Sequence, residues 1–274
     1  MQDEAIAPHG ETPIVLRREP AAHANVLADA LRNLSPAERL ARLRSEINGP
    51  IVFTHGFGIE GQVLFHWICE RGLDIDVVTL DTGRLFPETY ALWAETERRY
   101  GRRIRAVYPD HEALEKLVSK QGIDGFYESK RARQACCNLR KTKPIERVLE
   151  GAAAWITGLR ADQSATRKQA SLVAFDATRN VLKLNPLFDW NRDAVMAVVH
   201  ANDIPVNALH AKGFASIGCA PCTRAIAPGE PERNGRWWWE KRGSRECGLH
   251  LPKTRSKTRA LAQTASTSLS CGCG

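Results

Sequence analysis

Four cysteines in two pairs are the residues of this chain best suited to chemistry. Cys136 and Cys137 are adjacent, and Cys219 and Cys222 are separated by two residues. The spacing Cys-x-x-Cys occurs in zinc ribbons, thioredoxin-like sites and iron–sulfur proteins, so the second pair alone is ambiguous. Adjacent thiolates on a helix point about 100° apart, which suits a cluster of several irons better than one tetrahedral ion. We therefore expect a four-iron cluster, with structural zinc or unmetallated core cysteines as alternatives.

Cys247 lies apart from these pairs in a basic stretch of sequence. The basic residues near it are Arg233, Arg236, Arg242, Arg245 and His250. Positive charge lowers the pKa of a thiol and favours the nucleophilic thiolate. We predict that Cys247 is a nucleophile, the alternative being an ordinary cysteine, and that His250 positions or activates it or docks a redox partner.

A glycine-rich segment over residues 53–62 is a candidate phosphate site. Gly56, Gly58 and Gly61 fall between a predicted strand and a predicted helix. Glycines at such a junction let backbone N–H groups and a helix N-terminus approach a phosphate closely. We predict that Gly58 contacts a phosphate, although a tight turn explains the same pattern.

Short apolar runs alternate with amphipathic ones from residue 50 onward. The runs expected to form strands are 51–56, 75–82, 103–108, 153–159 and 181–190. The runs expected to form helices are 61–72, 87–100, 111–120, 136–149 and 191–202. This alternation predicts βαβ units, and hence an α/β fold with a mainly parallel sheet flanked by helices.

The ends of the chain have a different composition from its middle. We expect an irregular arm over 1–24, helices over 25–48 that break at Pro36, and one domain over 25–250 with a catalytic C-terminal segment at 233–250. Residues 251–274 are rich in Lys, Arg, Ser, Thr, Ala and Gly, so we expect a flexible basic tail.

Charge and hydropathy limit the classes of function. Four of the eight net positive charges lie in the segment 251–274, which leaves +4 for residues 1–250. That balance suits a small anionic substrate and is too weak to predict binding to nucleic acid. No run of 18 apolar residues occurs, so we expect no membrane segment and, with eight cysteines, a cytoplasmic protein.

Several further blocks resemble the sulfonucleotide reductases, specifically the thioredoxin-dependent assimilatory adenylyl-sulfate reductases. The resemblance runs from about Val52 to His250, and its blocks are LDTGRLFPETY (80–90), CCNLRK (136–141), WITGLRADQSATR (155–167), NPLFDW (185–190), SIGCAPCTR (216–224), GRWWWE (235–240) and ECGLH (246–250). It implies an adenine nucleotide α-hydrolase-like fold, also called ATP-pyrophosphatase-like. It also implies that the four paired cysteines hold a [4Fe-4S] cluster.

The same resemblance implies a reaction. Cys247 is expected to attack the sulfur of adenosine 5′-phosphosulfate, expel AMP and become S-sulfocysteine, from which reduced thioredoxin or a glutaredoxin-like donor releases sulfite. Such a step needs a thiolate and cations around the anhydride. The candidate cations are Lys141, Arg160, Arg167, Arg233 and Arg236. Because Lys141 follows Cys137 by four residues, it is expected on the same helix face, where it can link cluster and substrate.

The chain departs from the family pattern at two places. The glycine-rich loop commonly carries a hydroxyl residue and an acid where this chain has Gly56 and Gly61, so phosphate contacts would fall to backbone amides, Thr54 or His55. Some relatives carry a fused reductase domain, and we expect the segment that contains Cys271 and Cys273 to be too short to form one. We expect these two cysteines to have no specific role or to bind metal weakly, the alternative being a dithiol that relays electrons to Cys247.

The sequence is also compatible with other interpretations of function. The 3′-phosphorylated nucleotide, or both nucleotides, could be the substrate. Two remoter candidates are an ATP-splitting adenylating enzyme of the same fold and a zinc-stabilised nucleic-acid-binding protein. The first would need a loop that holds pyrophosphate and magnesium, which this chain lacks at residues 55–61. A homo-oligomer is also possible.

Overall fold

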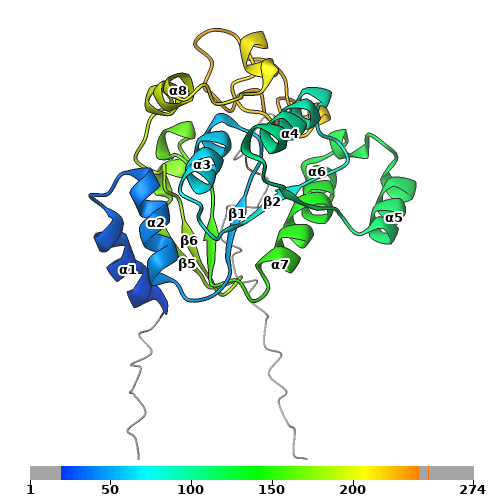
Figure 1. Cartoon of the computed structure of the whole chain (residues 1–274). Coiled ribbons are helices and arrows are strands. Elements are labelled where there is room, and N and C mark those ends of the chain that lie inside the picture. Colours follow the sequence, from blue (N-terminus) through cyan, green and yellow to red (C-terminus); the bar gives the residue numbers. More distant parts are fainter. Residues whose placement is uncertain (1–19, 241–245, 247–274) are drawn as a thin grey trace, which may run out of the picture.

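A computed structural model of the chain describes residues 20–240 and Glu246, and its centre is a six-stranded sheet (Figure 1). The strand order is β3-β2-β1-β4-β6-β5. The strands are β1 (Ile51–Thr54), β2 (Asp76–Leu80), β3 (Arg105–Val107), β4 (Ala154–Ile156), β5 (Val173–Asp176) and β6 (Val181–Leu184). Only β5 is antiparallel to its neighbour β6. The predicted mainly parallel sheet is therefore confirmed, and β5 is a strand that the sequence reading missed.

The helices lie close to the predicted runs. They are α1 (Pro20–Leu31), α2 (Pro36–Glu46), α3 (Ile59–Glu70), α4 (Pro87–Tyr100), α5 (His111–Gln121), α6 (Lys130–Cys137), α7 (Lys143–Leu149) and α8 (Arg192–Ala201). The break expected at Pro36 is present, because Ser35 caps α2 and forms a capping box with Glu38. Helix α1 begins at Pro20, so the last five residues of the predicted irregular arm are helical.

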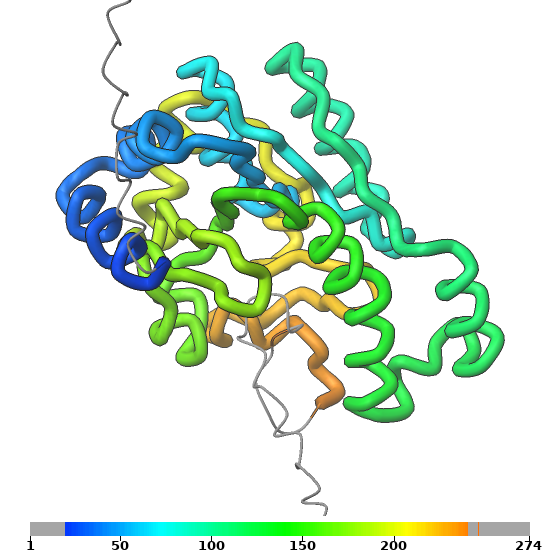
Figure 2. Tube along the Cα trace, turned by 90° about the horizontal axis from the view of Figure 1, so that it is seen from below, coloured from blue at the N-terminus to red at the C-terminus, as the bar shows by residue number. Residues whose placement is uncertain are grey.

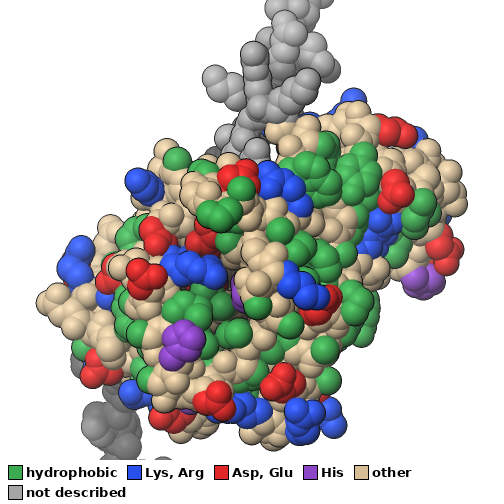
Figure 3. All heavy atoms as spheres, turned by 90° about the horizontal axis from the view of Figure 1, so that it is seen from above, with side chains coloured by type: hydrophobic (Ala, Val, Ile, Leu, Met, Phe, Trp, Pro, Cys, Tyr) green, Lys and Arg blue, Asp and Glu red, His purple; other side chains and the backbone are tan. Residues whose placement is uncertain are grey.

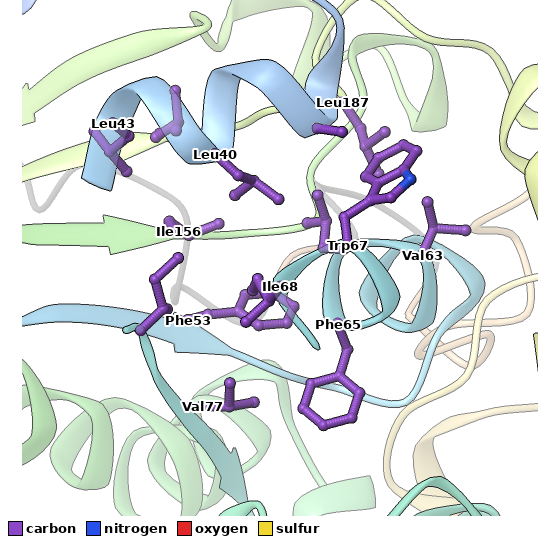
Figure 4. Packing of buried hydrophobic residues seen from close by; sticks show 14 of the residues in the cluster. Leu40, Leu43, Phe53, Val63, Phe65, Trp67, Ile68, Val77, Ile156 and Leu187 are labelled. Atoms are coloured by element: carbon purple, nitrogen blue, oxygen red, sulfur yellow. The ribbon is translucent and has the colours of Figure 1, made fainter. Parts of the chain in front are cut away.

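Alternation along β1 divides the core between the two faces of the sheet. Phe53 packs with residues of α1, α2, α3 and α8, whereas Val52 packs with residues of α7. Figure 4 shows Phe53 and Ile156 from the sheet below Leu40 of α2, with Ile68 of α3 beside Phe53. Each side chain buried in this way contributes about 1.5–3 kcal/mol. The packing fixes the strands, and with them the loops at their carboxyl ends.

The helices are spread across the width of the molecule. Helices α1 and α2 lie at one side and α5 lies at the opposite side in both views (Figures 1 and 2). None of the helices in residues 20–240 combines the length and the apolar character needed to cross a membrane. The sheet reverses its order between β1 and β4, and ligands of open α/β sheets bind outside the carboxyl ends of strands at such a point.

Candidate active site

A cleft lies at this switch point, above the carboxyl ends of β1 and β4. Its walls come from the loop after β1, the first turn of α3, the loop after β4, and the segments 215–218 and 232–237. Figure 3 looks onto this face, where Lys and Arg side chains lie on both sides of its middle. Segments far apart in sequence thus meet around one concave, partly basic surface.

The glycine-rich segment forms one wall of the cleft. Gly58 is the N-cap of α3 and has no side chain with which to cap it, so the first N–H groups of the helix are offered to the cleft. The preceding Phe57 has a φ of 55°, an uncommon conformation that stacking on Trp93 supports. The structure therefore places Gly58 at a helix N-terminus that suits an anion.

Two further side chains of this segment, Thr54 at the end of β1 and His55 after it, have partners inside the protein. Thr54 accepts a hydrogen bond from the Trp155 indole at 2.9 Å. His55 is buried against Phe53 and Phe57, and burial lowers its pKa to about 3, so its ring is neutral at neutral pH. Its Nδ1 accepts the N–H of Phe57 at 3.3 Å. His55 thus shapes the loop and brings no positive charge to the cleft.

Four of the five predicted cations line the cleft, and they come from distant parts of the chain. They are Lys141, Arg167, Arg233 and Arg236. Arg236 lies over the ring of Trp237 at 4.8 Å and donates to the carbonyl of Ile217 at 3.2 Å. The cations therefore form one electropositive wall, which favours an anionic group between them.

Arg160, the fifth predicted cation, does not line the cleft. Its guanidinium is fully buried and contacts Glu60 at 2.8 Å, Glu232 at 2.8 Å and Asp162. Burial opposes its charge, but Glu60 and Glu232 outweigh burial and raise the pKa of Arg160. Burial and the charge of Glu60 raise the pKa of Glu232. Each nitrogen of the Arg160 guanidinium thus has a carboxylate partner, and Arg160 supports two carboxylates that line the cleft.

Glu246 is a cleft residue that the sequence reading missed. Its carboxylate contacts Arg167 at 2.9 Å and Arg233 at 3.2 Å, and its side chain is only 2% exposed. Burial acts to raise its pKa, but the two arginines, with Arg236, hold that pKa below its usual value. The signal available in the sequence was an acid inside a basic stretch, next to the predicted nucleophile.

The four paired cysteines come together, as the two motifs predict. Cys136 and Cys137 end helix α6, whereas Cys219 precedes and Cys222 ends a short 3₁₀ turn over Ala220–Cys222. The four thiols line one small cavity and pack with Phe126. A π-helical turn over Asn138–Thr142 follows α6 directly, and such turns often occur at functional sites.

Charge around these thiols is uneven. Burial opposes ionisation of Cys219, but Lys141, a hydrogen bond with Thr82 at 3.3 Å, and Arg236 lower its pKa. Burial, and then the charge of Cys219, raise the pKa of Cys222 to about 12. The thiols therefore lie close enough for the charge of one to oppose that of another. Lys141 and Arg236, whose positive charges lower the pKa of Cys219, both line the cleft.

The donor set fits an iron–sulfur cluster. Within residues 20–240 and Glu246, the structure contains no group of three or more His, Cys, Asp or Glu side chains positioned to hold a metal ion. The four thiols nevertheless line one small cavity, and four cysteine thiolates are the usual ligands of a [4Fe-4S] cluster. Four positive residues line the same cavity and suit a negatively charged cluster: Arg84, Arg133, Arg140 and Lys141.

Lys141 and Thr82 connect the thiol cavity with the cleft. Lys141 lines both cavities. Thr82 lines the cleft, and its hydroxyl contacts the thiol of Cys219. Trp237 is buried, lines the cleft and packs with the cysteines. The position of Lys141 thus agrees with the predicted link, while its role in binding stays a prediction.

Several predicted residues lie outside the part of the chain that the structure describes. They are Cys247, His250, Cys271 and Cys273. Cys247 directly follows Glu246 in the sequence. The prediction that Cys247 is the nucleophile therefore depends on the sequence, together with the position of its neighbour on the wall of the cleft.

Comparison with known proteins gives a consistent result. The sequence model of the phosphoadenosine phosphosulfate reductase domain family matches residues 50–225. A protein of Sinorhizobium fredii (strain USDA 257) named adenosine 5′-phosphosulfate reductase is 50% identical over 244 residues, which cover 89% of this chain and 97% of the relative. A protein of the same name from Allochromatium vinosum is 46% identical, covering 85% and 90% of the two chains.

Solved structures agree with the sequence comparison. The crystal structure of phosphoadenylyl-sulfate reductase from Candida auris, a phosphate complex, matches with a TM-score of 0.63 and 25% identity. The match covers 75% of this chain and 97% of that one. The predicted adenine nucleotide α-hydrolase-like fold is thereby confirmed.

Proposed function

The chain belongs to the phosphoadenosine phosphosulfate reductase domain family, and from this premise we propose that it reduces adenosine 5′-phosphosulfate to sulfite and AMP. The reaction serves sulfate assimilation and cysteine biosynthesis in the cytoplasm, and a thioredoxin-type dithiol supplies the electrons. Two relatives named adenosine 5′-phosphosulfate reductase are 50% and 46% identical to the chain over 89% and 85% of its length.

One observation carries the proposal for this particular chain. Lys141, Arg167 and the pair Arg233 and Arg236 come from three separate segments and line the same cleft as the N-terminus of α3. In a nucleotide that carries a phosphosulfate group, the phosphate and the sulfate are both negatively charged. Preorganised cations and helix amides stabilise charge that moves onto the leaving phosphate. The cleft therefore supports transfer from a nucleotide with AMP as the leaving group.

The first chemical step belongs to Cys247. Its thiolate attacks the sulfur of the sulfonyl group, an S–S bond forms, and the S–O bond to the phosphate of AMP breaks. AMP leaves with that electron pair, and Cys247 becomes S-sulfocysteine. Lys141, Arg233 and Arg236 on the cleft wall stabilise the negative charge that gathers on AMP.

The second step uses the dithiol donor. One donor thiolate attacks the sulfur atom of Cys247, a disulfide between donor and enzyme forms, and sulfite leaves with the electrons of the broken S–S bond. The other donor thiol closes the donor disulfide and returns Cys247 as a thiol. The donor loses two electrons and the sulfonate sulfur gains two, so the electrons balance.

Cys136, Cys137, Cys219 and Cys222 would hold the [4Fe-4S] cluster. When bound, the cluster supplies structural and electrostatic stabilisation at the Lys141 side of the cleft, and the electrons come from the dithiol donor. Lys141 contributes by directing positive charge toward both the thiols and the cleft. Iron and sulfide analysis of the purified protein tests this assignment, and stoichiometric zinc would contradict it.

Mass spectrometry of the protein mixed with adenosine 5′-phosphosulfate alone tests the central step. The peptide that contains Cys247 is expected to gain one SO₃ group, and reduced thioredoxin is expected to remove it as sulfite. Cys247→Ser abolishes the gain, whereas Cys69→Ser on α3 keeps it, since Cys69 is a half-buried thiol that does not line the cleft. Sulfite production at the normal rate by Cys247→Ser would refute the proposal.

The choice of nucleotide needs a separate test. Turnover of adenosine 5′-phosphosulfate is compared with turnover of its 3′-phosphorylated form at equal concentrations. We expect the first to be preferred, as the names of the relatives indicate. Equal kcat/KM for the two nucleotides would make the chain a dual-substrate enzyme.

A further inference from the structure

Glu246 is the last residue in the part of the chain that the structure describes, and it lines the cleft. Its two oxygens accept from Nε and Nη2 of Arg167 at 2.9 and 3.2 Å, and one of them also accepts from Arg233 at 3.2 Å. Its side chain is 2% exposed, and the flanking arginines keep it ionised. A buried carboxylate with two arginine partners is a firm attachment, because hydrogen bonds between charged groups are the stronger ones.

Arg133 holds the same segment through a second set of contacts. Its guanidinium pairs with Glu240 at 2.7 and 2.9 Å and donates to the backbone carbonyl of Glu246 at 3.2 Å. Arg133 belongs to α6, the helix that ends in Cys136 and Cys137. The chain is therefore attached at Glu240 and again at Glu246, on both sides of residues 241–245.

We propose that Glu246 is a positioning residue that fixes the segment carrying Cys247 against the cleft. This proposal rests on the function proposed above, in which Cys247 attacks the sulfur of the nucleotide. A nucleophile one residue from a fixed anchor loses far less freedom when it reaches the sulfur. Holding a reacting group in place is worth large factors in rate, and a displacement of about 1 Å can cost about 100-fold.

The donors of Arg167 show that it acts through Glu246. Nε and Nη2 contact Glu246, and Nη1 contacts Gln163, so each nitrogen of the guanidinium has a protein partner. Gln163 in turn donates to Glu60 at 2.9 Å, which connects Arg167 to the ion pairs of Arg160. Arg167 is therefore a positioning residue as well, and the contacts with the anhydride fall to Lys141, Arg233 and Arg236.

A competing interpretation makes opposite predictions. If Glu246 instead occupied the place of the substrate anion, removing its charge would free Arg167 and Arg233 and tighten nucleotide binding. If Glu246 is an anchor, removing its charge leaves AMP binding nearly unchanged and slows transfer to Cys247. The two roles are thus separated by one variant and two measurements.

The test compares Glu246→Gln with the wild-type full chain. The rate of S-sulfocysteine formation in a single turnover is expected to fall about 10- to 100-fold, as the loss of charged hydrogen bonds predicts. The dissociation constant of AMP is expected to change less than about 3-fold, because ground-state contacts are kept. Glu246→Asp, which keeps the charge, is expected to recover part of the rate. Tenfold tighter AMP with unchanged transfer, or no recovery in Glu246→Asp, would overturn the proposal.

A second readout does not depend on turnover. Lys241, Arg242 and Arg245 are trypsin sites between the two attachments. Cleavage there is expected to be at least about 10-fold faster in Glu246→Gln than in wild type, since proteolysis follows local opening. Equal cleavage rates would refute the anchor even if transfer were slower. If the wild type formed no adduct with the nucleotide, the proposed function would fail while this measurement still tested the anchor.

Glu230→Gln is the matched control. Glu230 forms a similar two-oxygen pair with Arg224, at 3.0 Å for each oxygen, but it does not line the cleft. Its replacement is expected to leave transfer, AMP binding and trypsin cleavage at wild-type values. A loss equal to that in Glu246→Gln would show that any broken ion pair has this effect, and would overturn the proposal.

Discussion

Two buried groups of ion pairs border the cleft, and they are built in opposite ways. In the first, one arginine, Arg160, contacts three carboxylates. In the second, one carboxylate, Glu246, contacts two arginines. The first group therefore carries an excess of negative charge and the second an excess of positive charge, although both are assembled from the same kinds of residue.

The difference divides the cleft into two sides. Glu60 and Glu232 make the Arg160 side rich in acceptors, which suits hydroxyl and amine donors of a nucleoside. Arg233 and Arg236 make the other side rich in donors, which suits the phosphosulfate. We therefore expect substitutions in the first group to act mainly on stability and substitutions in the second mainly on catalysis.

Replacing Arg160 gives the largest expected effect. Arg160→Met leaves the buried Glu60 and the partly buried Glu232 without their cation, and removing one partner of a buried ion pair costs about 3–5 kcal/mol. Urea denaturation should show this loss in the free energy of unfolding. Arg98→Met on the exposed face of α4 is the control and should change stability little. A loss as small as that of the control would show that Arg160 is not the structural cation its contacts indicate.

The second effect in size concerns Arg236. Arg236→Gln removes one positive group from the anhydride side, so kcat/KM for adenosine 5′-phosphosulfate should fall about 10- to 100-fold, the value of one charged hydrogen bond. Steady-state kinetics measure the change, and Arg98→Gln again serves as control. If Arg236→Gln lowered stability as much as Arg160→Met and left kcat/KM intact, the proposed division of the cleft would be wrong.

The sequence predicted those parts of the molecule that depend on local pattern. Apolar alternation located β1, β2 and β4, because their residues alternate between two covered faces of the sheet. Paired cysteines predicted the thiol cavity, since two short motifs carry all four residues. Strand β5 was missed because its second half is only partly buried and it pairs at the edge of the sheet.

The partners of each arginine could not be predicted. Arg160 and Arg167 belong to one motif, yet Arg160 meets Glu60 and Glu232 from segments 100 and 72 residues away. Only the folded chain decides which cation a carboxylate neutralises. Glu246 was missed for the same reason, because its burial depends on arginines from two other segments.

A glycine beside Arg236 allows a smaller and more specific perturbation. A Cβ atom at Gly218 would lie 2.1 Å from Nη2 of Arg236, so Gly218→Ala displaces the end of that side chain without removing its charge. Folding should persist, because the end of a long side chain moves easily, while misplacement should lower kcat/KM about tenfold. In the double variant Gly218→Ala with Arg236→Gln, the alanine should cost nothing further. Additive losses would mean that Gly218 acts independently of Arg236.

The smallest effect is a difference in sign between the two groups as pH changes. The pKa of Glu246 is lower in the folded chain than its usual 4.5, so its contribution to stability is complete above about pH 4.5 and is lost as pH falls through the folded value. The pKa of Glu232 is raised above 4.5, so its contribution is complete below about pH 4.5 and is lost as pH rises through the folded value.

Replacing each acid with glutamine removes its titration and isolates its contribution. The stability cost of Glu246→Gln should therefore shrink as pH falls from about 7 toward about 4. The stability cost of Glu232→Gln should instead shrink as pH rises over the same range. Free energies of unfolding at several pH values give both slopes. Slopes of equal sign would mean that the two carboxylates feel the same surroundings. The contrast between one arginine shared by three acids and one acid shared by two arginines would then have no electrostatic consequence.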